Sequence, residues 1–232
     1  MTPRNIVRLG AAAISDALGK TGAMDHDMQC RSANPAMAGP AFTLRLHTAD
    51  LLMVSYALGE CPAGHVLVID AQGELNTAVW GELTTYCAEH KGVAGVVIDG
   101  AIRDLAKIRR SRFPVYARAV TPNAGGAEYL GDVNVAICCG GQVVRPGDWL
   151  VGDQDGVVVV PAEKLEDALD TARRIVTAEK GLERAILKGA DLGQLLRIGE
   201  KIERKRGEVF IPQLGARRGG TREGATRSIP AS

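Results

Sequence analysis

The sequence contains no apolar run long enough to cross a bilayer, which argues against a membrane protein built from helices. Its longest apolar stretches, such as 96–98 and 156–160, are far shorter than the roughly 20 residues of a spanning helix. Asp16 and Lys20 interrupt the N-terminal segment where a secretory signal needs an unbroken apolar stretch. We therefore expect no membrane association and a cytoplasmic location.

An excess of charge of one sign is also missing. The chain has 28 Lys and Arg residues against 27 Asp and Glu residues, a formal net charge of +1. A protein that binds nucleic acid needs a basic surface to neutralise phosphates and release counterions. We therefore expect no nucleic-acid partner.

Cysteine and histidine are too few and too scattered for a disulfide framework or a zinc site. The five cysteines are odd in number and include no Cys-x-x-Cys pair, and no two of the four histidines have the spacing of shared metal ligands. We interpret all five cysteines as reduced thiols, which agrees with a cytosolic protein.

The first half of the chain alternates between strand-like and helix-like segments. Continuous apolar runs are typical of strands that are covered on both faces, whereas apolar residues at helical spacing mark the helices. The expected strands are 41–47, 66–69, 95–98 and 115–120, and the expected helices are 5–20, 50–58 (capped by Asp50), 76–90 and 105–110. This alternation predicts a parallel sheet with covering helices.

The second half consists of shorter apolar segments separated by turn residues. Strands are expected at 133–137, 142–144, 149–152 and 157–160, and the Gly, Pro and Asp residues between them favour hairpins. These strands predict a second, mixed or antiparallel sheet. The fold class is therefore expected to be α/β, with two sheets and a helical layer in one domain.

The C-terminal part of the chain changes in composition. A long helix is expected over 161–187, with proline in its first turn and acidic residues near its positive end. We expect a single catalytic domain over 1–190 and a helical extension over 191–214. Residues 215–232 are rich in Gly, Arg, Thr and Ser and predict a disordered tail.

A loop from Asp99 to Asp104 is expected between the strand at 95–98 and the helix at 105–110. Ligands of α/β sheets bind beyond the carboxyl ends of the strands. There Arg103 offers a planar fork to a carboxylate, and Asp104 offers a hard oxygen ligand to Mg²⁺ or Mn²⁺. The alternative is an ordinary helix-capping aspartate beside a surface arginine.

A second segment, Gly81-Glu82-Leu83-Thr84, has the features of an anion-binding backbone. Gly81 permits close approach of a ligand, and free N–H groups at the start of a helix attract carboxylates. Glu82 is a candidate for orienting a water molecule. Its alternative role is that of an acidic residue in the first turn of a helix.

These motifs, taken in order, resemble a known family. The resemblance covers roughly residues 10 to 190 and rests on Ser15-Asp16-Ala17-Leu18, on Gly81-Glu82-Leu83, on Gly100 to Asp104, and on Pro146-Gly147-Asp148-Trp149 followed by 155–161. The family is that of the 4-hydroxy-4-methyl-2-oxoglutarate and 4-carboxy-4-hydroxy-2-oxoadipate aldolases, which also contains the regulator of ribonuclease activity A. The resemblance implies a three-layer ββα swivelling-type domain that assembles into homotrimers or homohexamers.

The resemblance also implies a role for each matching residue. Arg103 matches the arginine that holds the substrate carboxylate, and Asp104 matches the ligand of the divalent metal. The backbone of Gly81, Glu82, Leu83 and Thr84 matches the substrate-holding segment. Glu82 further matches a position that handles the catalytic water, and Glu179 matches a glutamate supplied by the long helix of a neighbouring subunit.

Two residues complicate the roles that the resemblance implies. Glu183 lies on the same apolar stripe of the long helix as Glu179, so helical spacing does not choose between them. Lys107 stands where the family usually has an acidic residue that helps to order the waters of the metal. A cation near the metal should weaken its binding unless the side chain points away.

The resulting hypothesis is a class II aldolase that uses Mg²⁺ or Mn²⁺. It would cleave 4-hydroxy-2-oxo acids to pyruvate and a second oxo acid, and it would decarboxylate oxaloacetate through the same enolate. The alternative is a non-catalytic regulator that binds a ribonuclease. A phosphohistidine carrier is disfavoured because no histidine lies in a suitable Gly- and Thr-rich loop.

Overall fold

The computed structural model describes residues 2–207 and has the α/β architecture expected from the sequence. Contacts within the chain define one unit over Met1–Lys180 and a second that begins at Gly181. Among the described residues, all the strands lie in the first unit. They are β1 Gln29–Cys30, β2 Met37–Arg45, β3 Val66–Trp80, β4 Gly95–Ile102, β5 Val115–Val120, β6 Asp132–Val133, β7 Ile137–Cys139, β8 Gln142–Val144, β9 Trp149–Asp153 and β10 Gly156–Val160.

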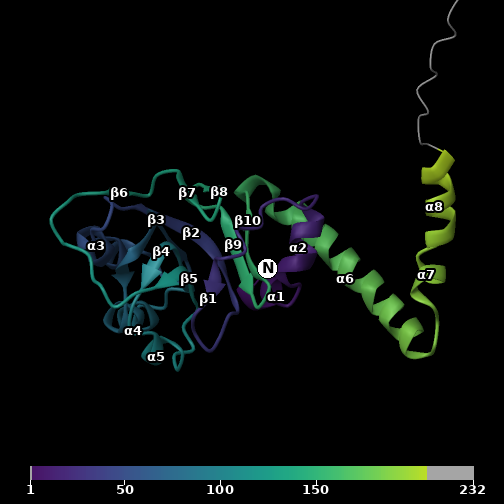
Figure 1. The fold of residues 1–232 in the computed structure, drawn as a ribbon, viewed down its shortest axis with the longest axis horizontal. Helices are drawn as coiled ribbons and strands as arrows, with labels where there is room; N and C mark the ends of the chain where they lie inside the picture. Colours follow the sequence, from purple (N-terminus) through teal and green to yellow (C-terminus); the bar gives the residue numbers. More distant parts are fainter. Residues whose placement is uncertain (1, 208–232) are drawn as a thin grey trace, which may run out of the picture. The chain divides into compact units, whose positions relative to one another are not determined.

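Strand β2 joins the parallel and the antiparallel strands (Figure 1). Its residues 41–45 pair in parallel with β3, which continues in parallel through β4 to β5. Its residues 37–40 pair antiparallel with β9, which pairs with β10. The resulting sheet has the order β1-β5-β4-β3-β2-β9-β10, with β6 also on β2, while β7 and β8 form a separate two-stranded sheet. The antiparallel strands of the second half are thus partly continuous with the parallel sheet.

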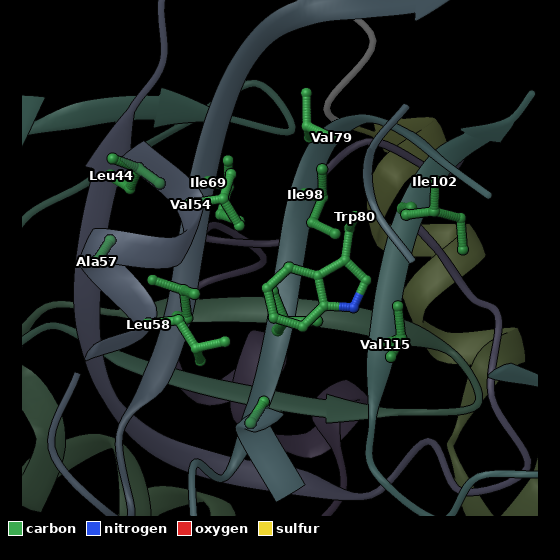
Figure 2. Close-up of a cluster of buried hydrophobic side chains, with 14 of the residues drawn as sticks. Leu44, Val54, Ala57, Leu58, Ile69, Val79, Trp80, Ile98, Ile102 and Val115 are labelled. Atoms are coloured by element: carbon green, nitrogen blue, oxygen red, sulfur yellow. The ribbon is translucent and has the colours of Figure 1, made fainter. Parts of the chain in front are cut away.

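Helices cover one face of the parallel strands. They are α3 Leu52–Glu60, α4 Glu82–His90 and α5 Leu105–Ile108, which lie together in Figure 1. Figure 2 shows their apolar contact, in which Val54, Ala57 and Leu58 of α3 lie over the strands and the Trp80 indole lies near Ile98. The sheet residues in this core are buried because both faces of the parallel strands are covered.

The opposite face of the parallel strands packs on β7 to β10. Val68 of β3, Val97 of β4 and Tyr116 of β5 meet Ile137 and Leu150 in a second buried cluster. The layers are therefore helices, parallel strands and antiparallel strands. The outer face of β9 and β10 is covered in turn by α1 Pro3–Val7, α2 Ala11–Ala17 and the start of α6 Leu165–Leu187.

Several segments differ from the sequence-based expectation; the strand expected over 133–137, for example, is divided between β6 and β7. The helix expected over 5–20 is two helices, because Gly10 between them has a φ of 84° and cannot continue a right-handed helix. The helix expected over 76–90 begins only at Glu82, because residues 76–80 belong to β3, whose Ala78 and Trp80 pair with β4. The loop expected over 99–104 is likewise shorter, because β4 continues to Ile102.

The described chain ends in helices. A 3-10 turn over Ala162–Lys164 leads into α6, and α7 Leu192–Leu195 and α8 Ile198–Gly207 follow it. The helical extension expected over 191–214 thus begins with helices, while its boundary at residue 190 stays a prediction. The tail expected over 215–232 lies outside the described residues. Between residues 2 and 207, no helix is both long and apolar enough to cross a membrane.

An ion-pair cluster fastens the β7–β8 hairpin to the parallel strands. Nε of Arg118 on β5 lies 2.5 Å from Oδ1 of Asp99 on β4, and the same guanidinium contacts Asp25 and Asp27 at 2.8 and 2.9 Å. The other Asp99 oxygen accepts a hydrogen bond from the Gly140 N–H group at 2.7 Å. The Asp99 side chain is only 9% exposed, so its charge depends on these partners.

Replacing Arg118 by methionine should therefore destabilise the protein. Removal of one partner from a buried ion pair leaves an uncompensated charge, and we expect the free energy of unfolding to fall by about 3 kcal/mol. Urea denaturation at fixed protein concentration, followed by circular dichroism, measures this change. Arg112→Met removes an exposed arginine and should stay within about 0.5 kcal/mol of the parent. Equal stability of the two variants would contradict a supporting role for Arg118.

Candidate functional site

A cleft lies where the adjacent parallel strands β3 and β4 end. Trp80 at the end of β3 is paired with Ile102 at the end of β4, so the segments that follow both strands meet at one edge of the sheet. The cleft has a volume of about 230 Å³. It is lined by Leu51, Ser55, Ala78, Val79, Trp80, Gly81, Glu82, Leu83, Thr84, Arg103 and Asp104. Every site residue inferred from the sequence, except Glu179, is in this lining.

Asp104 turns its carboxylate toward α4 rather than toward its own helix. Its φ of 57° places it in the left-handed region, which aspartate tolerates better than most residues. Its side chain makes no capping hydrogen bond to α5. Instead, Oδ2 accepts the N–H group of Glu82 at 3.0 Å. The ordinary helix-capping role considered for Asp104 therefore does not describe its geometry.

Gly81 allows this approach because it has no side chain. A β-carbon at this position would lie 2.5 Å from Oδ2 of Asp104 and 3.3 Å from Cγ of Arg103. Any other residue would displace the carboxylate or the backbone. The glycine between β3 and α4 is thus needed for space, since its extended φ of −158° is open to every residue type.

Buried hydrogen bonds on the core side hold Gly81 in place. The Thr85 hydroxyl donates to the Gly81 carbonyl at 2.8 Å and accepts the indole N–H of Trp80 at 2.8 Å. At the surface, the Thr84 hydroxyl accepts the Gly81 N–H at 3.0 Å, as in one half of a capping box. The core residue Trp80 therefore positions the first turn of α4.

Arg103 and the start of α4 present unused donors to the cleft. Nε of Arg103 lies 3.7 Å from Oδ2 of Asp104, and about half of the side chain is exposed. Within the described residues, the terminal nitrogens of Arg103 and the N–H groups of Leu83 and Thr84 make no hydrogen bond. The arrangement offers a guanidinium fork and a helix start to a carboxylate.

Glu82 is held by two donors from different helices. The Tyr86 hydroxyl donates to Oε1 at 2.9 Å, and Nζ of Lys107 on α5 donates to the same oxygen at 3.1 Å. These hydrogen bonds, first that of Tyr86 and then that of Lys107, hold the pKa of Glu82 below its usual value. Sequence reasoning missed Tyr86, although its spacing of four residues from Glu82 on a helix was a usable signal.

Glu179 does not reach this cleft within one chain. The apolar stripe of α6 is buried through Ala168, Leu169 and Ala172, and only partly at Val176. Glu179 and Glu183, further along, are both exposed. Another hollow, of about 430 Å³, lies between residues 26–35 and the β9–β10 turn, but it contains none of the predicted residues.

The donor set of the cleft suits a hard cation that keeps most of its waters. Among the described residues, no three His, Cys, Asp or Glu side chains form a group that could hold a metal by itself. Asp104 provides one carboxylate, of which Oδ1 has no hydrogen-bond partner within the described part of the chain. Mg²⁺ commonly binds through one or two protein carboxylates plus water and substrate, so this arrangement fits Mg²⁺ or Mn²⁺ better than zinc.

If the Trp80–Thr85 hydrogen bond supports the start of α4, its removal should destabilise the protein. Thr85→Val leaves the buried indole N–H without an acceptor and should lower the free energy of unfolding by about 1–3 kcal/mol. Urea denaturation followed by tryptophan fluorescence measures the loss. Thr84→Val removes a hydroxyl from the same turn at the surface and should cost about 0.5–1 kcal/mol. A larger loss for Thr84→Val than for Thr85→Val would refute the supporting role of the buried bond.

Comparisons with known proteins identify relatives of this chain. Residues 11–159 match the Aldolase/RraA family, described as RraA-like. A protein of Halalkalibacterium halodurans, named as a candidate 4-hydroxy-4-methyl-2-oxoglutarate aldolase, is 38% identical over 75% of this chain and 82% of its own length. The 4-hydroxy-4-methyl-2-oxoglutarate aldolase of Thermus thermophilus is 39% identical over 53% of this chain and 75% of its own.

A solved structure extends the likeness to the fold. The RNA-processing inhibitor RraA from Thermus thermophilus superposes with a TM-score of 0.61 at 34% identity, covering 65% of this chain and 91% of that one. Residues 11–159, which match the family, include the segments after β3 and β4 that line the cleft. The chain therefore belongs to the RraA-like, Aldolase/RraA family.

Proposed function

We propose that this protein is a divalent-metal-dependent (class II) aldolase. It would cleave 4-hydroxy-2-oxo acids to pyruvate and a second oxo acid and would also decarboxylate oxaloacetate. The observation that carries the proposal is the pairing, at one cleft, of the Asp104 carboxylate with the Arg103 guanidinium against the first turn of α4. The aldolase names of the relatives support the same reaction class.

Substrate binding would use the donors that the chain leaves unused. Arg103 would hold the carboxylate of the 2-oxo acid in a two-point contact, and the N–H groups of Leu83 and Thr84 would add hydrogen bonds from the helix start. Gly81 keeps this side of the cleft free of a side chain. The substrate would thus be oriented by groups that need little rearrangement.

Asp104 would hold the Mg²⁺ or Mn²⁺ ion. When bound, the ion supplies a Lewis acid that stabilises negative charge on the keto oxygen. The C3–C4 bond then breaks, its electron pair remains on the pyruvate fragment as an enolate, and protonation at C3 gives pyruvate. Glu82, kept ionised by Tyr86 and Lys107, would accept the C4 hydroxyl proton through a water molecule.

Assembly into a homotrimer or homohexamer would complete the cleft. Leu83 is 81% exposed at its edge, and Tyr86 on the same helix is 51% exposed. Large apolar side chains exposed next to a polar site favour burial by a partner. A neighbouring subunit would cover them, and its α6 would bring Glu179 to the Asp104 side of the cleft.

The metal mechanism is tested by a pyruvate-release assay over several 4-hydroxy-2-oxo acids and oxaloacetate. Excess EDTA should abolish turnover, and Mg²⁺ or Mn²⁺ should restore it. Asp104→Asn should remove nearly all turnover because the metal loses its ligand. Arg103→Met should instead weaken binding of a pyruvate analogue, since a charge-assisted pair worth roughly 1.5–3 kcal/mol is lost. Full activity in chelator, or wild-type kinetics in both variants, would exclude this mechanism.

A shared site predicts complementation between subunits. Asp104→Asn and Glu179→Ala should each be inactive alone, but mixed oligomers should contain some interfaces with both residues intact. We expect turnover to reappear after subunit exchange, with exchange verified by mass spectrometry of labelled chains. Glu183→Ala is the matched control on the same helix and should stay active. Verified exchange without recovery would mean that Glu179 does not complete a neighbour's cleft.

A non-catalytic regulator of a ribonuclease is the alternative function. It is favoured by the similarity to the RNA-processing inhibitor RraA from Thermus thermophilus. Binding of a ribonuclease would not depend on Asp104 as a metal ligand. Inhibition of a ribonuclease that Asp104→Asn leaves unchanged, together with no pyruvate release from any substrate, would favour this alternative over the aldolase.

A further inference from the structure

Lys107 bridges the two helices that form the cleft instead of extending into solvent. Its ammonium on α5 donates to Oε1 of Glu82 on α4 at 3.1 Å, although about half of the lysine side chain is exposed. The backbone N–H of Glu82 in turn donates to the Asp104 carboxylate. Lys107 is therefore connected to the proposed metal ligand through a single residue.

The Lys107–Glu82 ion pair changes how many carboxylate oxygens are free to accept hydrogen bonds near a cation at Asp104. Glu82 and Asp104 carry two negative charges, and Arg103 and Lys107 carry two positive charges. Of the two carboxylates, that of Glu82 is occupied at Oε1 by both Tyr86 and Lys107. These four charges sum to zero, so the hydrogen bonds that the carboxylates can still accept, rather than their net charge, decide how well the waters of an ion at Asp104 are held.

We propose that the Lys107–Glu82 ion pair sets a low metal affinity in this cleft, which rests on the proposed function. Lys107 donates to Oε1 of Glu82 beside Tyr86, so that oxygen accepts fewer hydrogen bonds from the waters around an ion at Asp104 than it would without the lysine. Outer-shell partners of this kind change metal affinity by about 10–100-fold. Lys107 acts through Glu82 and is a positioning residue, so loss of the lysine tightens metal binding mainly when Glu82 is present.

The double-mutant cycle of Lys107→Gln and Glu82→Gln isolates this coupling. Titration of the intact protein with Mn²⁺, with the free ion measured by electron paramagnetic resonance, gives the dissociation constant without an activity assay. We expect Lys107→Gln to lower Kd about tenfold. In the Glu82→Gln background, the same substitution should lower Kd no more than about twofold, the remainder being the direct effect of its charge.

Three further variants make the result specific. Lys107→Arg keeps the ion pair and should bind Mn²⁺ as the parent does. Arg109→Gln removes a positive charge from the end of the same short helix, near Arg31, and should leave Kd within about twofold of the parent. Asp104→Asn should abolish the site, and unchanged thermal unfolding verifies that each variant is folded.

The outcomes separate the two proposals. Mn²⁺ binding that Asp104→Asn does not alter, or no binding by any variant, overturns the metal mechanism and this inference with it. If Mn²⁺ binding requires Asp104 but Lys107→Gln does not tighten it, the role proposed for the Lys107–Glu82 pair is wrong, while the metal mechanism stands. Equal tightening by Lys107→Gln with and without Glu82, or by Arg109→Gln, also overturns it, because the effect would then be one of net charge.

Discussion

The hydrogen bond from the Glu82 N–H group to the Asp104 carboxylate is the contact on which the cleft depends. It ties the segment after β4 to the segment after β3 and orients the Asp104 carboxylate, which makes no capping hydrogen bond to its own helix. Two local features make it possible, namely the left-handed backbone of Asp104 and the missing side chain at Gly81. The same carboxylate is the ligand that the proposed chemistry requires.

The hydrophobic core supports that contact directly. Trp80 packs on the helix-covered face of the parallel strands (Figure 2), and its indole N–H is linked through Thr85 to the Gly81 carbonyl. Burial of the indole therefore fixes the start of α4 as well as stabilising the fold. A site placed on such a turn is rigid, which favours binding by preorganised donors.

The sequence predicted the parallel strands, the helical layer and the two chemical segments because each has a local signal. Buried strands have continuous apolar runs, and the Arg103-Asp104 and Gly81-Glu82 motifs stand at strand ends. It misplaced residues 76–80 in a helix because strand pairing with β4 outweighs their local preference. It also did not anticipate that β2 would join the parallel and antiparallel strands, since pairing depends on partners that lie far away in the chain.

By itself, the sequence named the candidate residues for the proposed chemistry, because a carboxylate can bind a hard cation, a guanidinium can bind a carboxylate and a glycine leaves space wherever each stands in the chain. Only the tertiary structure decided how they are used. It directed Asp104 to α4, brought Lys107 of one helix and Tyr86 of another to the same oxygen of Glu82, and left Glu179 exposed on α6. The reason is physical, since a side chain's role follows from its partners within a few ångströms, and those partners come from segments that only folding brings together.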